Sequence, residues 1–107
     1  MKYDKTIIIG RITDEPKFER MSDDRANAIA RFTLSNSTFR DGQEIPDFRA
    51  CVALGKQAGV MRGHLHKGDL LCIEGSYSVD ARTVKGVALA PCTIAAENVV
   101  FLSSRAR

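Results

Sequence analysis

The residues that could carry out catalysis are few, and their spacing does not favour an active site or a metal centre. The two histidines, His64 and His66, lie two positions apart, whereas the three cysteines are at least twenty positions from one another. Zinc sites instead place their ligands in close pairs. We therefore expect no metal, no other cofactor and no disulfide framework, with Cys51, Cys72 and Cys92 acting as buried small apolar residues.

Two further motifs fail as catalytic signals. Gly55-Lys56 resembles the end of a phosphate-binding loop, but Gln57 stands where Ser or Thr is needed, and the earlier glycine is missing. Asp23 and Asp24 are adjacent carboxylates in a polar segment, which is typical of a solvated turn. The sequence thus predicts a protein that is not an enzyme.

Composition and charge describe one ordinary soluble domain. The chain has 107 residues, of which 44% are hydrophobic and 27% charged. No apolar run approaches the ~20 residues of a membrane helix, so we expect a cytoplasmic protein without membrane contact. The net charge is +3, and the basic excess lies in residues 54–107, which hold seven basic and four acidic side chains. This charge is a mild indication of an anionic partner.

The first half of the chain predicts three strands. Residues 6–12 are rich in β-branched side chains, and residues 26–35 and 48–54 alternate with a period of two. Residues 36–47 contain Asp41-Gly42, so we expect an exposed loop or the tip of a hairpin there.

The second half predicts one helix and then two more strands. Ala58, Met61 and Leu65 have helical spacing within residues 56–65, and Gly68 is the expected C-terminal stop. A strand over residues 69–79 leads to a turn at Lys85-Gly86. The last strand runs in pieces, because Pro91 interrupts residues 87–102.

The order of these elements is three strands, a helix and a final two-stranded hairpin. It is the order of the OB-fold, an all-β, five-stranded Greek-key barrel with one helix between strands three and four. We expect a single domain over residues 1–103, followed by a short basic tail at 104–107.

Five ordered segments resemble the DNA-binding domain of bacterial-type single-stranded DNA-binding proteins (SSBs). The segments cover nearly the whole chain and are IIIGRITDEPKF (7–18), ARFTLSNSTFRDG (30–42), DFRACVALGKQAG (47–59), HLHKGDLLCIEGSY (64–77) and AAENVVFL (95–102). The resemblance implies a non-catalytic, nucleoid-associated protein that coats single-stranded DNA in replication, recombination or repair, usually as a homotetramer, or else as a dimer. Bases would stack on aromatic rings while Lys and Arg follow the phosphates.

The resemblance also implies which side chains would meet the bases. Phe39 and Phe48 fall at family stacking positions. Leu54 falls at a third, where a leucine replaces the usual ring, and Arg82 or a near neighbour falls at the fourth, where a guanidinium can stack on a base. Tyr77 could substitute as a stacking residue, although a core or interface role is the stronger interpretation.

The expected phosphate contacts are basic residues along the same path. Two of them match family positions near the DNA, and the others flank the proposed groove: Lys56 and Lys67, then Lys5, Arg11, Arg40, Arg49 and Lys85. Singly, each could be an ordinary solvated charge. As a set they favour an anionic ligand.

The sequence stops at Arg107 without the acidic, aromatic tip that many cellular SSBs carry. Recruitment of replication enzymes through such a tail is therefore not expected, and a short form would suit a phage, plasmid or other mobile element. Two alternatives remain open: an interaction module of primosome or replication-restart type with secondary DNA binding, and an RNA-binding OB protein, because stacking does not distinguish the two sugars.

Overall fold

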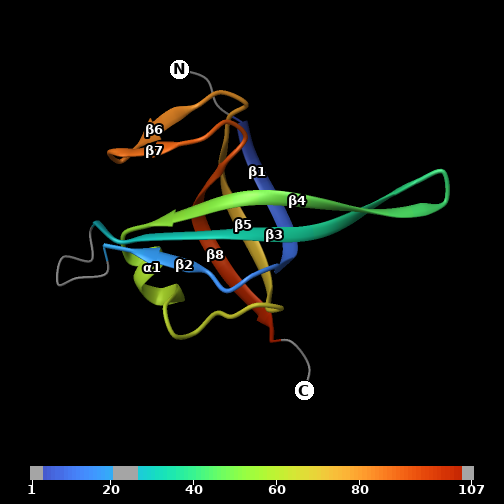
Figure 1. Cartoon of the computed structure of the whole chain (residues 1–107), viewed down its shortest axis with the longest axis horizontal. Coiled ribbons are helices and arrows are strands. Elements are labelled where there is room, and N and C mark those ends of the chain that lie inside the picture. The colour runs from blue at the N-terminus through green and yellow to red at the C-terminus, as the bar shows by residue number, and fades with distance from the viewer. Residues whose placement is uncertain (1–3, 21–26, 105–107) are drawn as a thin grey trace.

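The computed structural model describes residues 4–20 and 27–104, which form a strand-rich barrel with one short helix and a long projecting hairpin (Figure 1). The predicted polar turn at 21–25, with Asp23 and Asp24, and the tail residues 105–107 lie outside the described residues. The elements are β1 (Asp4–Ile12), β2 (Lys17–Glu19), β3 (Ile29–Arg40), β4 (Gln43–Leu54), α1 (Lys56–Met61), β5 (Leu70–Tyr77), β6 (Arg82–Val84), β7 (Val87–Leu89) and β8 (Ile94–Ser103).

Backbone pairing closes five of these strands into a barrel. The sheet order is β1-β5-β8-β4-β3-β2, and β1 also pairs with β3 at Arg11 and Ile12. All pairings are antiparallel except that of β4 with β8. The short β2 adds to the edge of β3, and β6 and β7 form a separate two-stranded hairpin. This is the OB-fold that the order of elements predicts, with α1 between the third and fourth barrel strands.

The two faces of β3 and β4 contribute side chains to two different hydrophobic clusters. Ala30, Phe32 and Leu34 join Cys51 and Ala53 inside the barrel. The residues of opposite parity pack under the β6–β7 hairpin, in a smaller cluster of Ile29, Val52, Val87, Leu89 and Ala95. The predicted faces of both strands are therefore confirmed, and the β6–β7 hairpin covers part of the outer face of β3 and β4.

The helix is shorter than expected. It ends at Met61 rather than Leu65, and Gly63 then adopts a positive φ of 80°. Gly68 does not cap it, because its N–H donates to the carbonyl of Ile12 in the β1 end. Gly59 and Gly63 lower the helix propensity of this segment. The helix is therefore held mainly by the packing of Ala58 and Met61 into the barrel core. No helix in the described part of the chain is long and apolar enough to cross a membrane.

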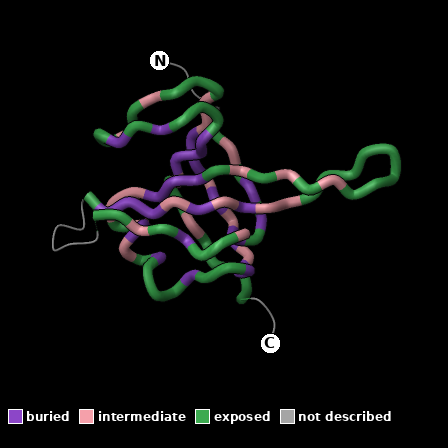
Figure 2. Tube along the Cα trace, viewed as in Figure 1, coloured by how far each residue is buried: buried purple, intermediate pink, exposed green. Residues whose placement is uncertain are grey.

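The β3–β4 hairpin extends well beyond the barrel, as an arm in which most residues are exposed (Figures 1 and 2). We define the arm as residues 35–48 with the turn at Asp41 and Gly42, whose φ values of 54° and 78° suit a type I′ turn. A hairpin tip is thus confirmed. The strands run further than predicted, because the ladder continues from Asn36–Asp47 to Arg40–Gln43.

Two of the cysteine expectations are wrong. Cys51 is buried, but Cys72 is half-buried and Cys92 is exposed. Cys92 lies in the turn after Pro91, between β7 and β8, so its side chain belongs to neither strand's buried face.

Candidate nucleic-acid interface

The arm presents two aromatic rings on the same side of its ribbon. Phe39 lies opposite Glu44 and Phe48 lies opposite Ser35, so the two rings share parity and are four residue pairs apart. At about 3.3 Å per residue this separates them by roughly 13 Å along the strands. Phe39 is 75% exposed and Phe48 60% exposed. Each ring is therefore too far from the other to stack on it and can receive a flat ligand.

Leu54 continues the Phe48 side of β4 but does not project as a ring would. It is half-buried and packs against the cluster beneath the β6–β7 hairpin. It lies at the end of β4 that is remote from the arm, and it borders the hollow beside Val84 and Lys85 rather than the groove.

A groove of about 390 Å³ continues from the arm along the outer face of the barrel. Its floor is the same side of β3 and β4 that carries Phe48, and its walls are the loop after β1 and the segment between β7 and β8. The lining residues are Asp14, Glu15, Lys17, Arg31, Phe32, Thr33, Ala50, Cys51, Val52, Ala90 and Thr93. This is the face of the OB-fold that binds oligonucleotides.

Two groove cations were not among the sequence-predicted site residues. Lys17 and Arg31 face each other across the β2–β3 pairing, and the Arg31 Nε donates to Glu19 Oε2 at 2.9 Å. The alternation of side chains along β3 could have identified Arg31, because this residue lies on the same side of the strand as Phe39. For Lys17 no signal existed, since the short β2 was not predicted.

The predicted basic residues do not all gather at this face. Arg40 and Arg49 have the opposite parity to Phe39 and Phe48, so they lie on the other side of the ribbon. The Arg49 Nε also contacts Asp47 Oδ2 at 3.3 Å. These two cations therefore border the arm rather than line the track between the two rings.

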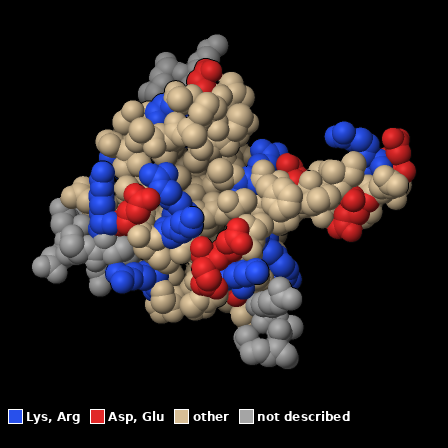
Figure 3. All heavy atoms as spheres, in the orientation of Figure 1, with Lys and Arg blue, Asp and Glu red and all other residues tan. Residues whose placement is uncertain are grey.

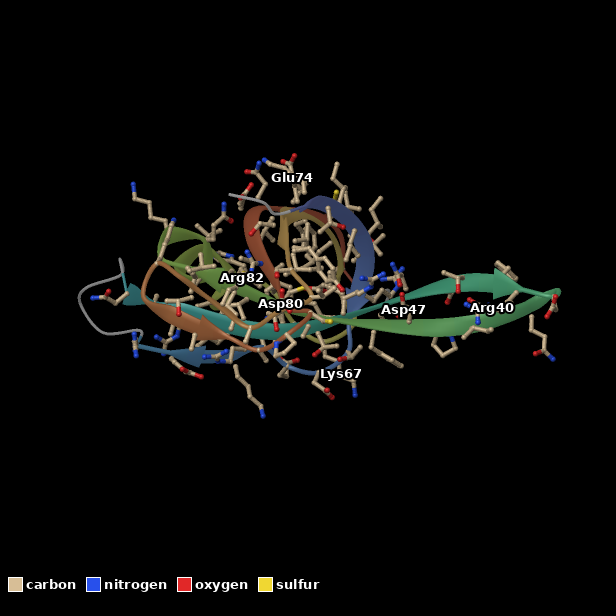
Figure 4. All side chains as sticks on the ribbon, turned by 90° about the horizontal axis from the view of Figure 1, so that it is seen from above. Arg40, Asp47, Lys67, Glu74, Asp80 and Arg82 are labelled. Carbon is tan, nitrogen blue, oxygen red and sulfur yellow. The ribbon has the colours of Figure 1, made fainter. Side chains whose placement is uncertain are left out.

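Three lysines stay exposed near the groove or hairpin. Lys85 lies at the tip of the β6–β7 hairpin with a φ of 51°, and Lys56 begins α1. Lys67 lies beside the groove wall, because its backbone N–H donates to Glu15 Oε2 at 2.9 Å. Figure 4 shows Lys67 on the opposite side of the molecule from Glu74, which marks the outer face of β5.

The remaining predicted residues are engaged in the fold. The Lys5 Nζ contacts Glu97 Oε1 at 3.0 Å, and the Arg11 guanidinium donates to the Gly68 carbonyl at 2.9 Å. Tyr77 is half-buried and packs against the barrel core, in line with its core interpretation. The guanidinium of Arg82 donates hydrogen bonds to Ser76 and Thr93 and is half-buried beneath the hairpin.

The groove has mixed charge rather than a continuous basic lining. In the view of Figure 3, basic and acidic side chains are interspersed over the face that β3 and β4 present. The pKa of Glu15 is lowered, first by the hydrogen bond from the Lys67 backbone and then by the His66 ring, whose Nδ1 lies 3.3 Å from Glu15 Oε1. Glu15 therefore stays ionised at neutral pH and faces any anionic ligand in the groove.

Chemistry other than binding has little support among the described residues. No group of three or more His, Cys, Asp or Glu in this part of the chain could hold a metal ion. Burial raises the pKa of the Cys51 thiol to about 12, so this groove cysteine remains a neutral thiol. What the face offers is exposed rings, a groove and scattered cations.

The fold and this face define an oligonucleotide-binding type of β-barrel. Residues 3–102 match the single-strand binding protein family. The chain belongs to that family.

Curated relatives agree with the family match. The chain is 32% identical over 106 residues to a single-stranded DNA-binding protein of Lactiplantibacillus plantarum, a match that covers 95% of this chain and 52% of the relative. It is 33% identical over 101 residues to single-stranded DNA-binding protein 3 of Clostridium acetobutylicum, covering 92% and 69% of the two chains. The chain thus spans about half the length of the first relative.

Solved structures share the fold at low sequence identity. A small single-stranded DNA-binding protein of Streptomyces coelicolor superposes with a TM-score of 0.69 at 18% identity, covering 94% of each chain. The Plasmodium falciparum SSB in its complex with ssDNA superposes with a TM-score of 0.73 at 17% identity, covering 96% of this chain and 97% of the other.

Proposed function

We propose that this protein binds single-stranded DNA without sequence preference and protects it during replication, recombination or repair, with no catalytic step of its own. The observation that carries the proposal is the pair of exposed rings, Phe39 and Phe48, on the side of the arm that leads into the OB-fold groove. Membership of the single-strand binding protein family and the named relatives support it.

The binding face can contact two parts of a nucleic acid, the bases and the phosphates. Each exposed ring can stack on a base, which is worth ~1–3 kcal/mol per base and is tolerant of sequence. Exposed cations such as Lys67, Lys85 and Lys17 can neutralise phosphates, and the release of counterions then makes affinity fall with salt. Asp14 and Glu15 oppose this attraction at the groove wall.

A fluorescence anisotropy titration tests the proposal. A labelled oligo-dT and an equal-length duplex are titrated with the protein at ~50 and ~200 mM salt, since the chain has no Trp for intrinsic quenching. We expect tight, salt-sensitive binding to the single strand over the duplex. Weak binding to both would contradict the proposal and favour the interaction module, and preference for a matched RNA in competition would favour the RNA-binding alternative.

We also propose that the protein works as a homo-oligomer, a tetramer or a dimer, through the outer face of β1, β5 and β8. Ile9, Cys72 and Val100 form one row across these strands, and Ile7 and Leu102 extend the exposed aliphatic surface. Among the described residues, β1 pairs with β3 only at its last two positions, so much of one β1 edge is open to a second copy.

Light scattering on the wild type and on Ile9→Lys tests this assembly. We expect a multiple of the 11.8 kDa chain mass for the wild type and a shift toward the monomer for the variant, because the lysine would bury a charge in an apolar interface. A wild type that scatters as a monomer at micromolar concentration would contradict the proposal.

A further inference from the structure

Arg82, the first residue of β6, joins the β6–β7 hairpin to the barrel through three hydrogen bonds. Its Nη1 donates to Ser76 Oγ at 3.0 Å, and its Nη2 donates to the Ser76 carbonyl at 2.8 Å and to the Thr93 carbonyl at 3.2 Å. Ser76 and Thr93 are both buried, at the end of β5 and just before β8. In Figure 4 the Arg82 side chain reaches from the hairpin toward the barrel.

Few other hydrogen bonds join the hairpin to the barrel among residues 4–20 and 27–104. In the described part of the chain β6 and β7 pair only with each other, so no sheet ladder fixes them. The Cys92 N–H donates to the Ser78 carbonyl at 2.9 Å near the hairpin base. Apolar packing holds Val87 and Leu89, but Val84 and Lys85 border a hollow of about 200 Å³ shared with Leu54 and Glu97. Packing alone therefore leaves the hairpin tip loosely held.

We propose that Arg82 is a positioning residue, which sets the β6–β7 hairpin at a fixed height over the DNA-binding face and so places Lys85. The inference rests on the proposed function and adds to it a role for a residue expected to meet the bases. Both terminal nitrogens of the guanidinium donate hydrogen bonds, to three protein oxygens in all. The planar, forked guanidinium suits this arrangement, whereas a lysine ammonium does not.

The binding test uses Arg82→Met and Arg82→Lys in the oligo-dT titration, over a series of salt concentrations. A positioning role predicts that both variants lose affinity by about three- to tenfold, because neither can make all three hydrogen bonds. Both variants also lower the slope of log K against log salt to the same extent, because the released hairpin no longer holds Lys85 at a phosphate. A direct phosphate contact predicts instead that Met lowers the slope by ~0.7 and that Lys restores it, and this outcome would overturn the proposal.

Arg62→Met is the matched control for loss of one positive charge. Arg62 is exposed directly after α1 and is neither a predicted interface residue nor part of the groove lining, so its removal should leave affinity within about twofold. If Arg82→Trp increased affinity, base stacking would be the role of this position and the positioning role would be overturned.

Hydrogen exchange on the free protein keeps the proposal separate from DNA binding. In Arg82→Met the amides of residues 82–89 should exchange about tenfold faster while those of the barrel strands are unchanged, since only the hairpin is released. Ser76→Ala, which removes one of the three acceptors, should give a smaller acceleration in the same segment. Unchanged exchange in both variants would overturn the positioning role, whereas failure of the wild type to bind oligo-dT would overturn only the proposed function.

Discussion

The arm and the outer face of β1, β5 and β8 both expose large apolar side chains, but they expose different kinds. On the arm, two phenylalanine rings stand apart, with Ser35 and Glu44 as their cross-strand neighbours. On the outer face, aliphatic side chains adjoin one another, and Ile9 and Val100 are 54% and 51% exposed on either side of Cys72. The first surface is interrupted and aromatic, and the second is continuous and aliphatic.

This difference separates two kinds of partner. An isolated ring with polar neighbours stays exposed to water, and it is stabilised most by a flat ligand, such as a base, that stacks on it. A contiguous aliphatic surface gains from covering by another apolar surface, as in a subunit interface. Exposed hydrophobicity alone would not distinguish the two, whereas substitutions on each surface would show whether each has its own partner.

The largest expected effect comes from removing both rings. In Phe39→Ala with Phe48→Ala, affinity for oligo-dT should fall by at least about tenfold, because two base-stacking contacts are lost. The measurement is the anisotropy titration, with circular dichroism to show that the fold is retained. Phe101→Ala is the control, since Phe101 is half-exposed at the α1 end of β8 and outside the proposed track. An unchanged affinity in the double variant would place the DNA elsewhere.

Thiol labelling tests the other side of the comparison. Cys72 lies on the outer face, so a second copy would shield it, and in the Ile9→Lys variant its labelling should be about fivefold faster. Cys92 should react readily in both proteins, since it is exposed. Cys51 should react only on unfolding, because it is buried and its thiol pKa is about 12. Equal Cys72 rates in the two proteins would show that the outer face is not covered.

Much of this comparison could be predicted from the sequence, because alternation is local. The parity of Phe39 and Phe48 on two paired strands follows from the turn at Asp41-Gly42, and so does the opposite parity of Arg40 and Arg49. The early end of α1 was less visible, because the spacing of its apolar residues continues to Leu65 while the backbone turns away at Gly63.

The contacts of Arg82 could not be predicted from the sequence at all. Two of its three acceptors are backbone carbonyls, which every residue carries, and the Thr93 carbonyl reaches it only through the return of the chain into β8. Side-chain identity predicts a cation at this position but not which oxygens surround it. The same limit applies to the Lys5 and Glu97 pair, which are far apart in the sequence.

A smaller effect is expected from the groove floor. Arg31→Met should lower affinity for oligo-dT by about two- to fourfold and reduce the salt slope by ~0.7, if one phosphate contact is lost. Glu19→Gln should act in the opposite direction, because it frees Arg31 from its 2.9 Å ion pair. Arg62→Met again controls for charge. A salt slope that Arg31→Met leaves unchanged would remove this residue from the phosphate path.

The smallest effect concerns Glu15, for which stability and binding should change in opposite directions. Its pKa in the folded protein is lowered from the ordinary 4.5, chiefly by the Lys67 N–H and then by His66. The ionised group therefore contributes stability that is fully present above pH 4.5 and is lost as pH falls through the lower folded value. Glu15→Gln should melt slightly earlier than the wild type at pH 7, with the difference vanishing in acid.

The same Glu15→Gln substitution should slightly raise affinity for oligo-dT at pH 7, because it removes a negative charge from the groove wall. Thermal melts between about pH 3 and pH 7, together with anisotropy at pH 7, measure both effects on one variant. A gain in affinity would mean that Glu15 holds the loop after β1 in shape even though its charge weakens DNA binding. A loss of affinity would show instead that Glu15 supports DNA binding directly.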